Sequence, residues 1–201
     1  MSIVITIGRE FGSGGRELGR RIADELGIAY YDKEILQAIA EKTSYCLKYV
    51  ESVSEERPQP LLPIHYGVTF ATLPTKSEPL DVFTAQAQIL RELALKSSCV
   101  IIGRAADDIL ADLHPFRIYC YSDLATKVKR CRERGDESPE KDLIRNIKRI
   151  DKRRRRFYEY TTGIPWGRKD HYDLMINTTN LDIKPLAHAL AMMIKEKMNG
   201  E

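Results

Sequence analysis

Residues 4–18 read VITIGREFGSGGREL, an apolar β-type run followed by a glycine-rich turn and the first residues of a helix. Four of the chain's 12 glycines fall in this one turn: Gly8, Gly12, Gly14 and Gly15. Glycine tolerates positive φ and close backbone approach, and the free N–H groups of a helix N-terminus point toward a bound anion. The stretch therefore predicts a strand, a turn and a helix that together bind a phosphate group.

The turn departs from the phosphate-loop pattern G-x-x-x-x-G-K-[ST], because no register supplies a lysine followed by Ser or Thr. If Gly15 is the last glycine, Arg16 takes the lysine position and Glu17 the position of the magnesium-binding hydroxyl. If Gly14 is the last glycine, Gly15 takes the lysine position and Arg16 the hydroxyl position. In either register, we expect nucleotide phosphates to bind at Gly8, Gly12, Ser13, Gly14, Gly15, Arg16 and Glu17.

Length and composition indicate one ordinary globular domain over residues 1–201, with 43% hydrophobic and 30% charged residues. No apolar run reaches the roughly 18 residues that a membrane span needs, and the N-terminus enters a strand without a signal peptide. We therefore expect a cytoplasmic protein. The four cysteines form no C-x-x-C pair, which favours buried thiols over a zinc site or disulfides.

Apolar runs alternate with helical patterns along the chain. Strands are expected at residues 4–8, 28–31, 99–102, 117–121 and 172–177. This alternation predicts a three-layer α/β/α domain with a five-stranded parallel sheet. Ligands of such sheets bind at the carboxyl ends of the strands, where Asp32 and residues 103–108 stand. Residues 43–79 contain five prolines and no sustained period, which indicates either a functional insert or a partly mobile segment.

Three ordered stretches carry a family resemblance. They are ITIGREFGSGGREL with YYDKEIL, then SCVIIGRAADDIL, then DKRRRRFYEYTTGIPWG with YDLMINTT. Together they resemble the cytidylate kinase-like family of P-loop nucleoside monophosphate kinases. The resemblance implies a P-loop kinase fold with an acceptor-binding insert over residues 33–96 and a helical lid over residues 135–166.

The resemblance also implies roles for single residues. Arg104, which follows Gly103, matches the arginine that holds the acceptor phosphate, and Asp32 matches the position that faces the acceptor nucleotide. The aspartate that the family carries after that arginine is Ala105 here, and Asp107 and Asp108, a turn further on, are the two candidates to replace it.

Asp151 and Arg154 match the family's D-x-x-R in the lid, whose arginine contacts phosphate during transfer. Asp151 lies within i+3 reach of Arg154 and is expected to orient it. Most of the basic run between residues 127 and 156 is expected to be a solvated face. No base-reading module accompanies it, so nucleic acid is not an expected partner.

The resulting hypothesis is a kinase that transfers the γ-phosphoryl group of ATP to CMP or dCMP, with Arg16, Arg104 and Arg154 as catalytic residues. No metal site made of protein ligands alone is visible, so Mg²⁺ would arrive with the nucleotide. Two alternatives stay open: a kinase for another small acceptor, and a nucleotide-binding regulatory module that lost transfer with the lysine. The expected partners are a nucleotide and a small acceptor without a membrane, and homo-oligomer formation is undecided.

Overall fold

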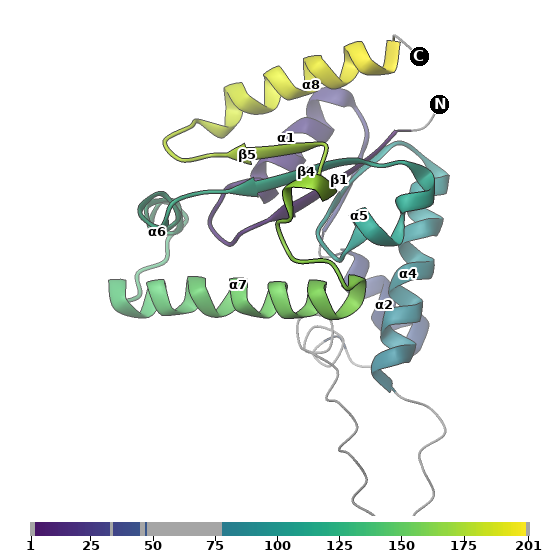
Figure 1. The fold of residues 1–201 in the computed structure, drawn as a ribbon, viewed down its shortest axis with the longest axis horizontal. Coiled ribbons are helices and arrows are strands. Elements are labelled where there is room, and N and C mark those ends of the chain that lie inside the picture. Colours follow the sequence, from purple (N-terminus) through teal and green to yellow (C-terminus); the bar gives the residue numbers. More distant parts are fainter. Residues whose placement is uncertain (1–2, 33, 45–46, 48–77, 200–201) are drawn as a thin grey trace, which may run out of the picture.

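The protein was analysed as a computed structural model, which describes residues 3–32, 34–44, 47 and 78–199. Its centre is one parallel sheet with the strand order β2-β3-β1-β4-β5 (Figure 1). The strands are β1 (Val4–Arg9), β2 (Ala29–Tyr31), β3 (Cys99–Ile102), β4 (Phe116–Tyr121) and β5 (Leu174–Asn177). The predicted α/β fold with five parallel strands is confirmed, and β1, which leads into the glycine turn, occupies the middle of the sheet.

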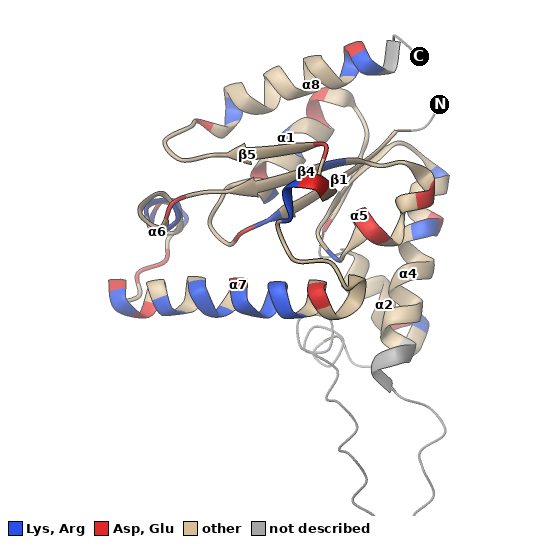
Figure 2. Cartoon of the chain, in the orientation of Figure 1, with Lys and Arg blue, Asp and Glu red and all other residues tan. Residues whose placement is uncertain are grey.

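Helices cover both faces of this sheet. Buried residues of α1 (Gly15–Leu26) and α8 (Ile183–Asn199) pack on one face. Those of α2 (Glu34–Thr43), α4 (Glu78–Lys96) and the short α5 (Ala106–Ile109) pack on the other. The remaining elements are α6 (Leu124–Glu133), α7 (Glu140–Thr162) and the 3-10 turns η1 (Ala111–Leu113) and η2 (Lys169–His171). Figure 2 shows α7 as one long helix carrying many basic residues, on the side of the sheet away from α8.

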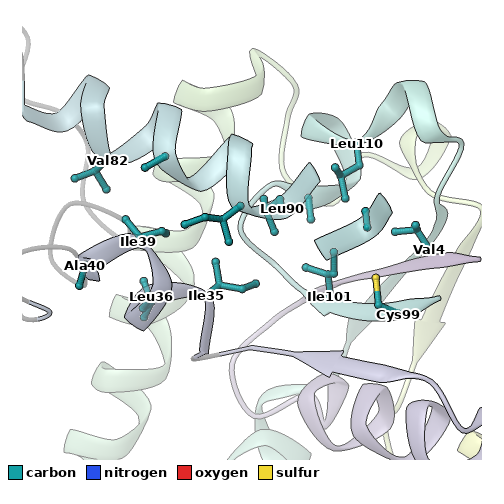
Figure 3. Packing of buried hydrophobic residues seen from close by; sticks show 14 residues of the cluster. Val4, Ile35, Leu36, Ile39, Ala40, Val82, Leu90, Cys99, Ile101 and Leu110 are labelled. Carbon is teal, nitrogen blue, oxygen red and sulfur yellow. The ribbon is translucent and has the colours of Figure 1, made fainter. Parts of the chain in front are cut away.

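The alternation of side chains along the strands divides the core into two clusters. In β1, Val4 joins the cluster under α2 and α4, whereas Ile5 and Ile7 join the cluster under α1 and α8. Successive strand residues point to opposite faces, so a fully buried strand is apolar at every position. Figure 3 shows the first cluster, in which Ile35 and Leu90 of the two helices meet the sheet.

In two helices the N-cap is the residue after a serine that favours helix initiation. Asp123, and not the neighbouring Ser122, is the N-cap of α6, and its Oδ1 accepts a hydrogen bond from Thr126 N at 2.8 Å. Pro139, and not the neighbouring Ser138, is the N-cap of α7. In both places two helix-initiating residues adjoin, and local propensity does not choose between them.

The predicted insert, residues 33–96, is described only in part, because residues 33, 45–46 and 48–77 lie outside the described residues. Its described ends, α2 and α4, contribute Ile39 and Ile89 to the core and so belong to the domain's framework. Cys99, Cys120 and Cys131 are buried free thiols as expected, and Cys46 falls outside the described part. Among the described helices, none has both the length and the apolar composition that crossing a bilayer requires.

Candidate active site

The glycine turn joins the carboxyl end of β1 to the N-terminus of α1. Gly12 and Gly14 have φ of 78° and 83°, a left-handed conformation that favours glycine. Gly14 is the N-cap of α1 and Gly15 its first residue, with no side chain capping the helix in the usual way. Gly15 N makes only a long 3.5 Å contact with Ser13 Oγ. This geometry suits the predicted anion site, which stays a prediction.

Ser13 holds the loop in place from its inner side. Its hydroxyl is buried and donates to the carbonyl of Glu10 at 2.8 Å. Its own carbonyl accepts hydrogen bonds from Thr178 Oγ1 at 2.7 Å and from Arg130 Nη1 at 3.0 Å. Ser13 thus ties the loop to α6 and to Thr178, which follows β5, and its hydroxyl bonds within the loop itself.

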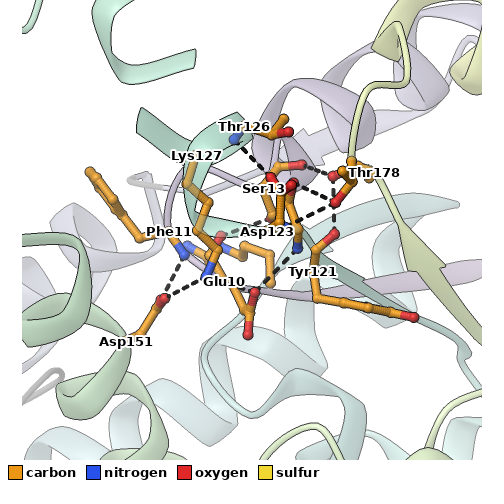
Figure 4. A network of polar contacts seen from close by, with 12 residues as sticks. Glu10, Phe11, Ser13, Tyr121, Asp123, Thr126, Lys127, Asp151 and Thr178 are labelled. Carbon is orange, nitrogen blue, oxygen red and sulfur yellow. Dashed lines mark hydrogen bonds and ion pairs between the residues drawn. The ribbon is translucent and has the colours of Figure 1, made fainter. Parts of the chain in front are cut away.

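A buried ionic network lies behind the same loop (Figure 4). Lys127 Nζ of α6 lies 2.7 Å from Glu10 Oε2 and 3.2 Å from Asp151 Oδ2. Asp151 Oδ1 accepts a hydrogen bond from Phe11 N at 2.6 Å. Burial raises the pKa of Asp151, and the Phe11 N–H and Lys127 oppose that rise. The network joins the loop, α6 and α7, and it gives Asp151 a role in positioning the loop. The charge of Arg154 also acts on Asp151, and the predicted orientation of Arg154 by Asp151 stays a prediction.

Two arginines, Arg9 and Arg16, form ion pairs with Asp32 at the carboxyl edge of the sheet. Asp32, which is buried, contacts Arg16 directly, and its Oδ1 lies 3.9 Å from Arg9 Nη2. Burial, together with the charges of Arg154 and Arg104, lowers the pKa of Arg9 to about 9 against the opposing effect of Asp32. Five arginines but only two carboxylates, Glu10 and Asp32, line the cavity at this edge, so its surface favours an anion.

Two cavities open beside these arginines. The larger, about 350 Å³, is lined by the glycine loop, Asp32 and Arg134. The smaller, about 50 Å³, is lined by residues that include Gly8, Asp107, Tyr158, Trp166 and Tyr172. Three side chains line both cavities, and all three are arginines: Arg9, Arg104 and Arg154. A group passing from one cavity to the other meets these guanidinium groups.

The turn after β3 has an unusual backbone conformation. Gly103, Arg104 and Ala105 have φ of 67°, 62° and 52°, three consecutive residues in the left-handed region. For residues with a Cβ this conformation costs roughly 1–2 kcal/mol each and is concentrated at functional sites. Gln86 Nε2 of α4 donates to the carbonyl of Arg104 at 3.1 Å and helps to hold the turn. With the turn in this conformation, Arg104 lines both cavities.

Asp107 anchors the far half of α7. Its buried Oδ2 accepts a hydrogen bond from Tyr158 OH at 2.6 Å and lies 3.1 Å from His171 Nε2. Burial, together with the neighbouring Asp107 charge, raises the pKa of Tyr158, so its hydroxyl remains a donor. Asp107 lies on the wall of the smaller cavity, next to the arginines.

The structure thus assembles most of the predicted residues. Those lining the larger cavity are Gly12, Gly14, Gly15, Arg16, Asp32, Arg104 and Arg154. Glu17 instead pairs with Arg21 at 2.8 Å on an exposed part of α1. Sequence reasoning missed Arg9, Phe11 and Lys127. A signal existed for Arg9, which lies inside the glycine turn, but none existed for Lys127, which looked like one more residue of the basic run.

Comparison with known proteins agrees with this arrangement. The model of the family described as cytidylate kinase-like matches residues 4–180. An uncharacterized protein from Eubacterium ventriosum is 26% identical, with a TM-score of 0.71 over 96% of this chain and 99% of that chain. No curated protein sequence matches significantly.

Two solved shikimate kinases share the fold. The enzyme from Acinetobacter baumannii is 16% identical, with a TM-score of 0.53 over 98% of this chain and 95% of that chain. The enzyme from Aquifex aeolicus is 14% identical, with a TM-score of 0.51 over 99% of this chain and 100% of that chain. At these identities the two structures support the P-loop kinase fold alone.

Proposed function

Since the chain belongs to the cytidylate kinase-like family, we propose that it transfers the γ-phosphoryl group of ATP to a small anionic acceptor of the CMP or dCMP type. The observation that carries this proposal is that Arg9, Arg104 and Arg154 line both cavities. Phosphoryl transfer needs positioning and positive charge around the migrating group more than it needs covalent chemistry.

In this proposal the donor phosphates bind at the glycine loop and the acceptor binds on the side of Asp107. An acceptor oxygen forms a bond to the γ-phosphorus, the bond from that phosphorus to the β–γ bridging oxygen breaks, and its electron pair leaves with ADP. A phosphate oxygen of a nucleoside monophosphate is already anionic, so this acceptor requires no general base. Arg104 and Arg154 bind the acceptor phosphate and the group in transfer.

Magnesium fits the larger cavity as an ion that arrives with the nucleotide. Within the described residues, no cluster of three His, Cys, Asp or Glu side chains could hold a metal. Glu10 and Asp32 line the cavity, and Mg²⁺ commonly takes one or two carboxylates, several waters and the substrate phosphates. The ion would neutralise charge on the β- and γ-phosphates.

Residues 135–166 act as the lid in this proposal. The two ends of α7 are flanked by Gly135 and Gly163, which have φ of 87° and 69°, and a Cβ added at either position would meet no atom within 4 Å. Both positions can absorb a change in backbone angle. Arg154, whose Nη1 donates to the carbonyl of Arg9 at 3.4 Å, would be carried onto the reacting group by closure.

A second candidate is a kinase for a smaller anionic acceptor. The volume of about 50 Å³ beside Asp107 favours it. The insert, residues 33–96, would select between the two acceptor types.

The experiment that tests the proposal is turnover of the full chain with ATP, Mg²⁺ and a panel of acceptors, with the phosphorylated product identified by mass. The panel contains all nucleoside monophosphates and several small hydroxy-carboxylates. Transfer to CMP or dCMP above the others is the expected result. Binding of ATP without transfer to any acceptor would overturn it in favour of a nucleotide-binding regulatory module.

A further inference from the structure

The inference concerns the missing lysine of the phosphate loop, and it rests on the proposed function. In the register where Gly14 closes the loop, Gly15 stands at the lysine position. A Cβ placed on Gly15 would lie 2.7 Å from Arg9 Cβ and 3.4 Å from Arg9 Cγ. Real Cβ atoms do not approach each other this closely. The side chain of Arg9 therefore takes the space in which a side chain of residue 15 would begin.

Gly103 also leaves room for the side chain of Arg9. A Cβ on Gly103, in the turn after β3, would overlap Arg9 Nη1. Arg9 thus runs from the end of β1, past the first residue of α1, to the turn that carries Arg104. Its guanidinium is nearly buried, with 17% of the side chain exposed, and it lines both cavities.

We propose that Arg9 is the cation that binds the β- and γ-phosphates of the donor, in place of the lysine that the phosphate-loop pattern puts at position 15. The lysine of that pattern reaches the same two phosphates from the first turn of the helix. Here the positive charge comes from the other end of the loop, and residue 15 is a glycine because the side chain of Arg9 passes beside it.

Other cations near the loop have different geometry. Arg16 is half exposed and in contact with Asp32. Lys127 Nζ lies between Glu10 and Asp151 behind the loop. Arg130 donates to the carbonyls of Ser13, Thr178 and Leu181 and to the hydroxyl of Thr178, which makes it a structural residue. Arg9 alone of these four lines both cavities.

Binding measurements test the proposal without requiring turnover. The full chain is titrated by calorimetry with a non-hydrolysable ATP analogue and with ADP, each with Mg²⁺. Arg9→Met should weaken binding of the analogue by about 10–100-fold and binding of ADP by less, because a charge-assisted contact to the γ-phosphate is lost. Arg9→Lys should retain part of the affinity. An Arg9→Met protein that binds the analogue like wild type would overturn the proposal.

A swap of the two positions provides the sharper test. Gly15→Lys alone should lose analogue binding, because the new side chain collides with Arg9. The double variant Arg9→Gly/Gly15→Lys, which restores the ordinary pattern at both positions, should recover binding to within about tenfold of wild type. A double variant that binds no better than Gly15→Lys alone would contradict the exchange of positions.

Folding is checked by melting each variant without ligand. Removing a buried guanidinium beside Arg104 and Arg154 relieves repulsion, so Arg9→Met should melt at or above the wild-type temperature.

The binding data distinguish failure of this proposal from failure of the proposed function. Wild type that does not bind the analogue overturns the proposed function. If wild type binds the analogue, and Arg16→Met weakens that binding while Arg9→Met does not, the assignment of Arg9 is overturned and the proposed function is not.

Discussion

The carboxylate of Asp151, in the middle of α7, accepts a hydrogen bond from the backbone N–H of Phe11 at 2.6 Å and so attaches the long basic helix to the glycine loop. Its second oxygen contacts Lys127 of α6. Phe11 also lies under Arg154, whose Cζ is 5.7 Å from the ring centroid. A ligand that moves the loop would therefore move the helix that carries Arg154, which couples phosphate binding to the position of a proposed catalytic residue.

The lid proposal predicts a change in amide exchange over residues 135–166. A bisubstrate analogue should slow exchange there, since it gives the basic helix an anion to close upon. Arg154→Ala should lower turnover, and Arg145→Ala, which changes an exposed arginine of the same helix, should not. Exchange that is equally slow with and without the analogue, or full turnover by Arg154→Ala, would remove the lid from the mechanism.

Asp151 predicts a defined pH dependence. Burial raises the pKa of Asp151 in the folded state above its value of 3.8, although Phe11 and Lys127 oppose the rise. Between the two pKa values the folded protein holds a proton that the unfolded chain has released, so stability falls as pH rises. The free energy of unfolding of wild type, relative to Asp151→Asn, should therefore decrease as the pH rises above the ordinary pKa of an aspartate side chain. Urea unfolding of both proteins at several pH values measures this difference in the free energy of unfolding. A difference that increases with pH would show that the contacts of Asp151 with Phe11 and Lys127 outweigh its burial.

Gly14→Ala and Gly27→Ala form a matched pair at two left-handed positions, with φ of 83° and 65°. A Cβ at Gly14 would lie 2.7 Å from Ile183 Cδ1, whereas Gly27 has open space around it. Both substitutions should lower the free energy of unfolding by about 1 kcal/mol or more. Only Gly14→Ala should also weaken ATP binding, as measured by calorimetry. Equal binding by the two variants would argue against an anion site at the loop.

Arg104 should matter for transfer more than for folding. Arg104→Ala should reduce kcat/KM by about 10²–10³, since removing a phosphate-binding cation costs a few kcal/mol in the transition state. Its melting temperature should stay near that of wild type. Arg91→Ala is the control, because Arg91 forms an exposed ion pair with Asp112. Parallel loss of activity and stability would identify Arg104 as a structural residue instead.

Tyr158→Phe should destabilise the fold through Asp107. The variant removes the hydroxyl that donates to Asp107 Oδ2 at 2.6 Å and leaves a buried carboxylate with one donor fewer. Such a loss costs about 1–3 kcal/mol. Tyr160→Phe, on the same helix with 55% exposure, should change stability by less than about 0.5 kcal/mol. Chemical unfolding of both variants at neutral pH decides the matter, and equal effects would contradict the anchoring role.

The sheet and the loop were predictable because their signals are local. The run of residues 4–7 is apolar at nearly every position, and the four glycines between residues 8 and 15 are typical of an anion-binding turn. The rule that parallel strands present ligands at their carboxyl ends correctly placed Asp32 and Arg104 beside the loop. Period and composition carry this information within a short window, so no tertiary contact is needed to read it.

The partners of individual side chains were not predictable in the same way. Lys127 and Asp151 lie 24 residues apart and meet only because α6 and α7 pack against the loop. By sequence spacing, Asp151 belongs with Arg154, but in the folded chain its two oxygens bind Phe11 and Lys127. Spacing along a helix shows which residues share a face, and it does not show what that face meets.

By itself, the sequence determined the α/β fold, the glycine turn between a strand and a helix, and the family, because each of these follows from patterns that are continuous along the chain. Only the tertiary structure decided which cation serves the turn. The side chain of Arg9 fills the space that a side chain at residue 15 would need. Gly103, which follows a strand about 90 residues later in the sequence, leaves room for the Arg9 guanidinium. That choice depends on steric contact between segments remote in sequence, which close packing creates and no local pattern records.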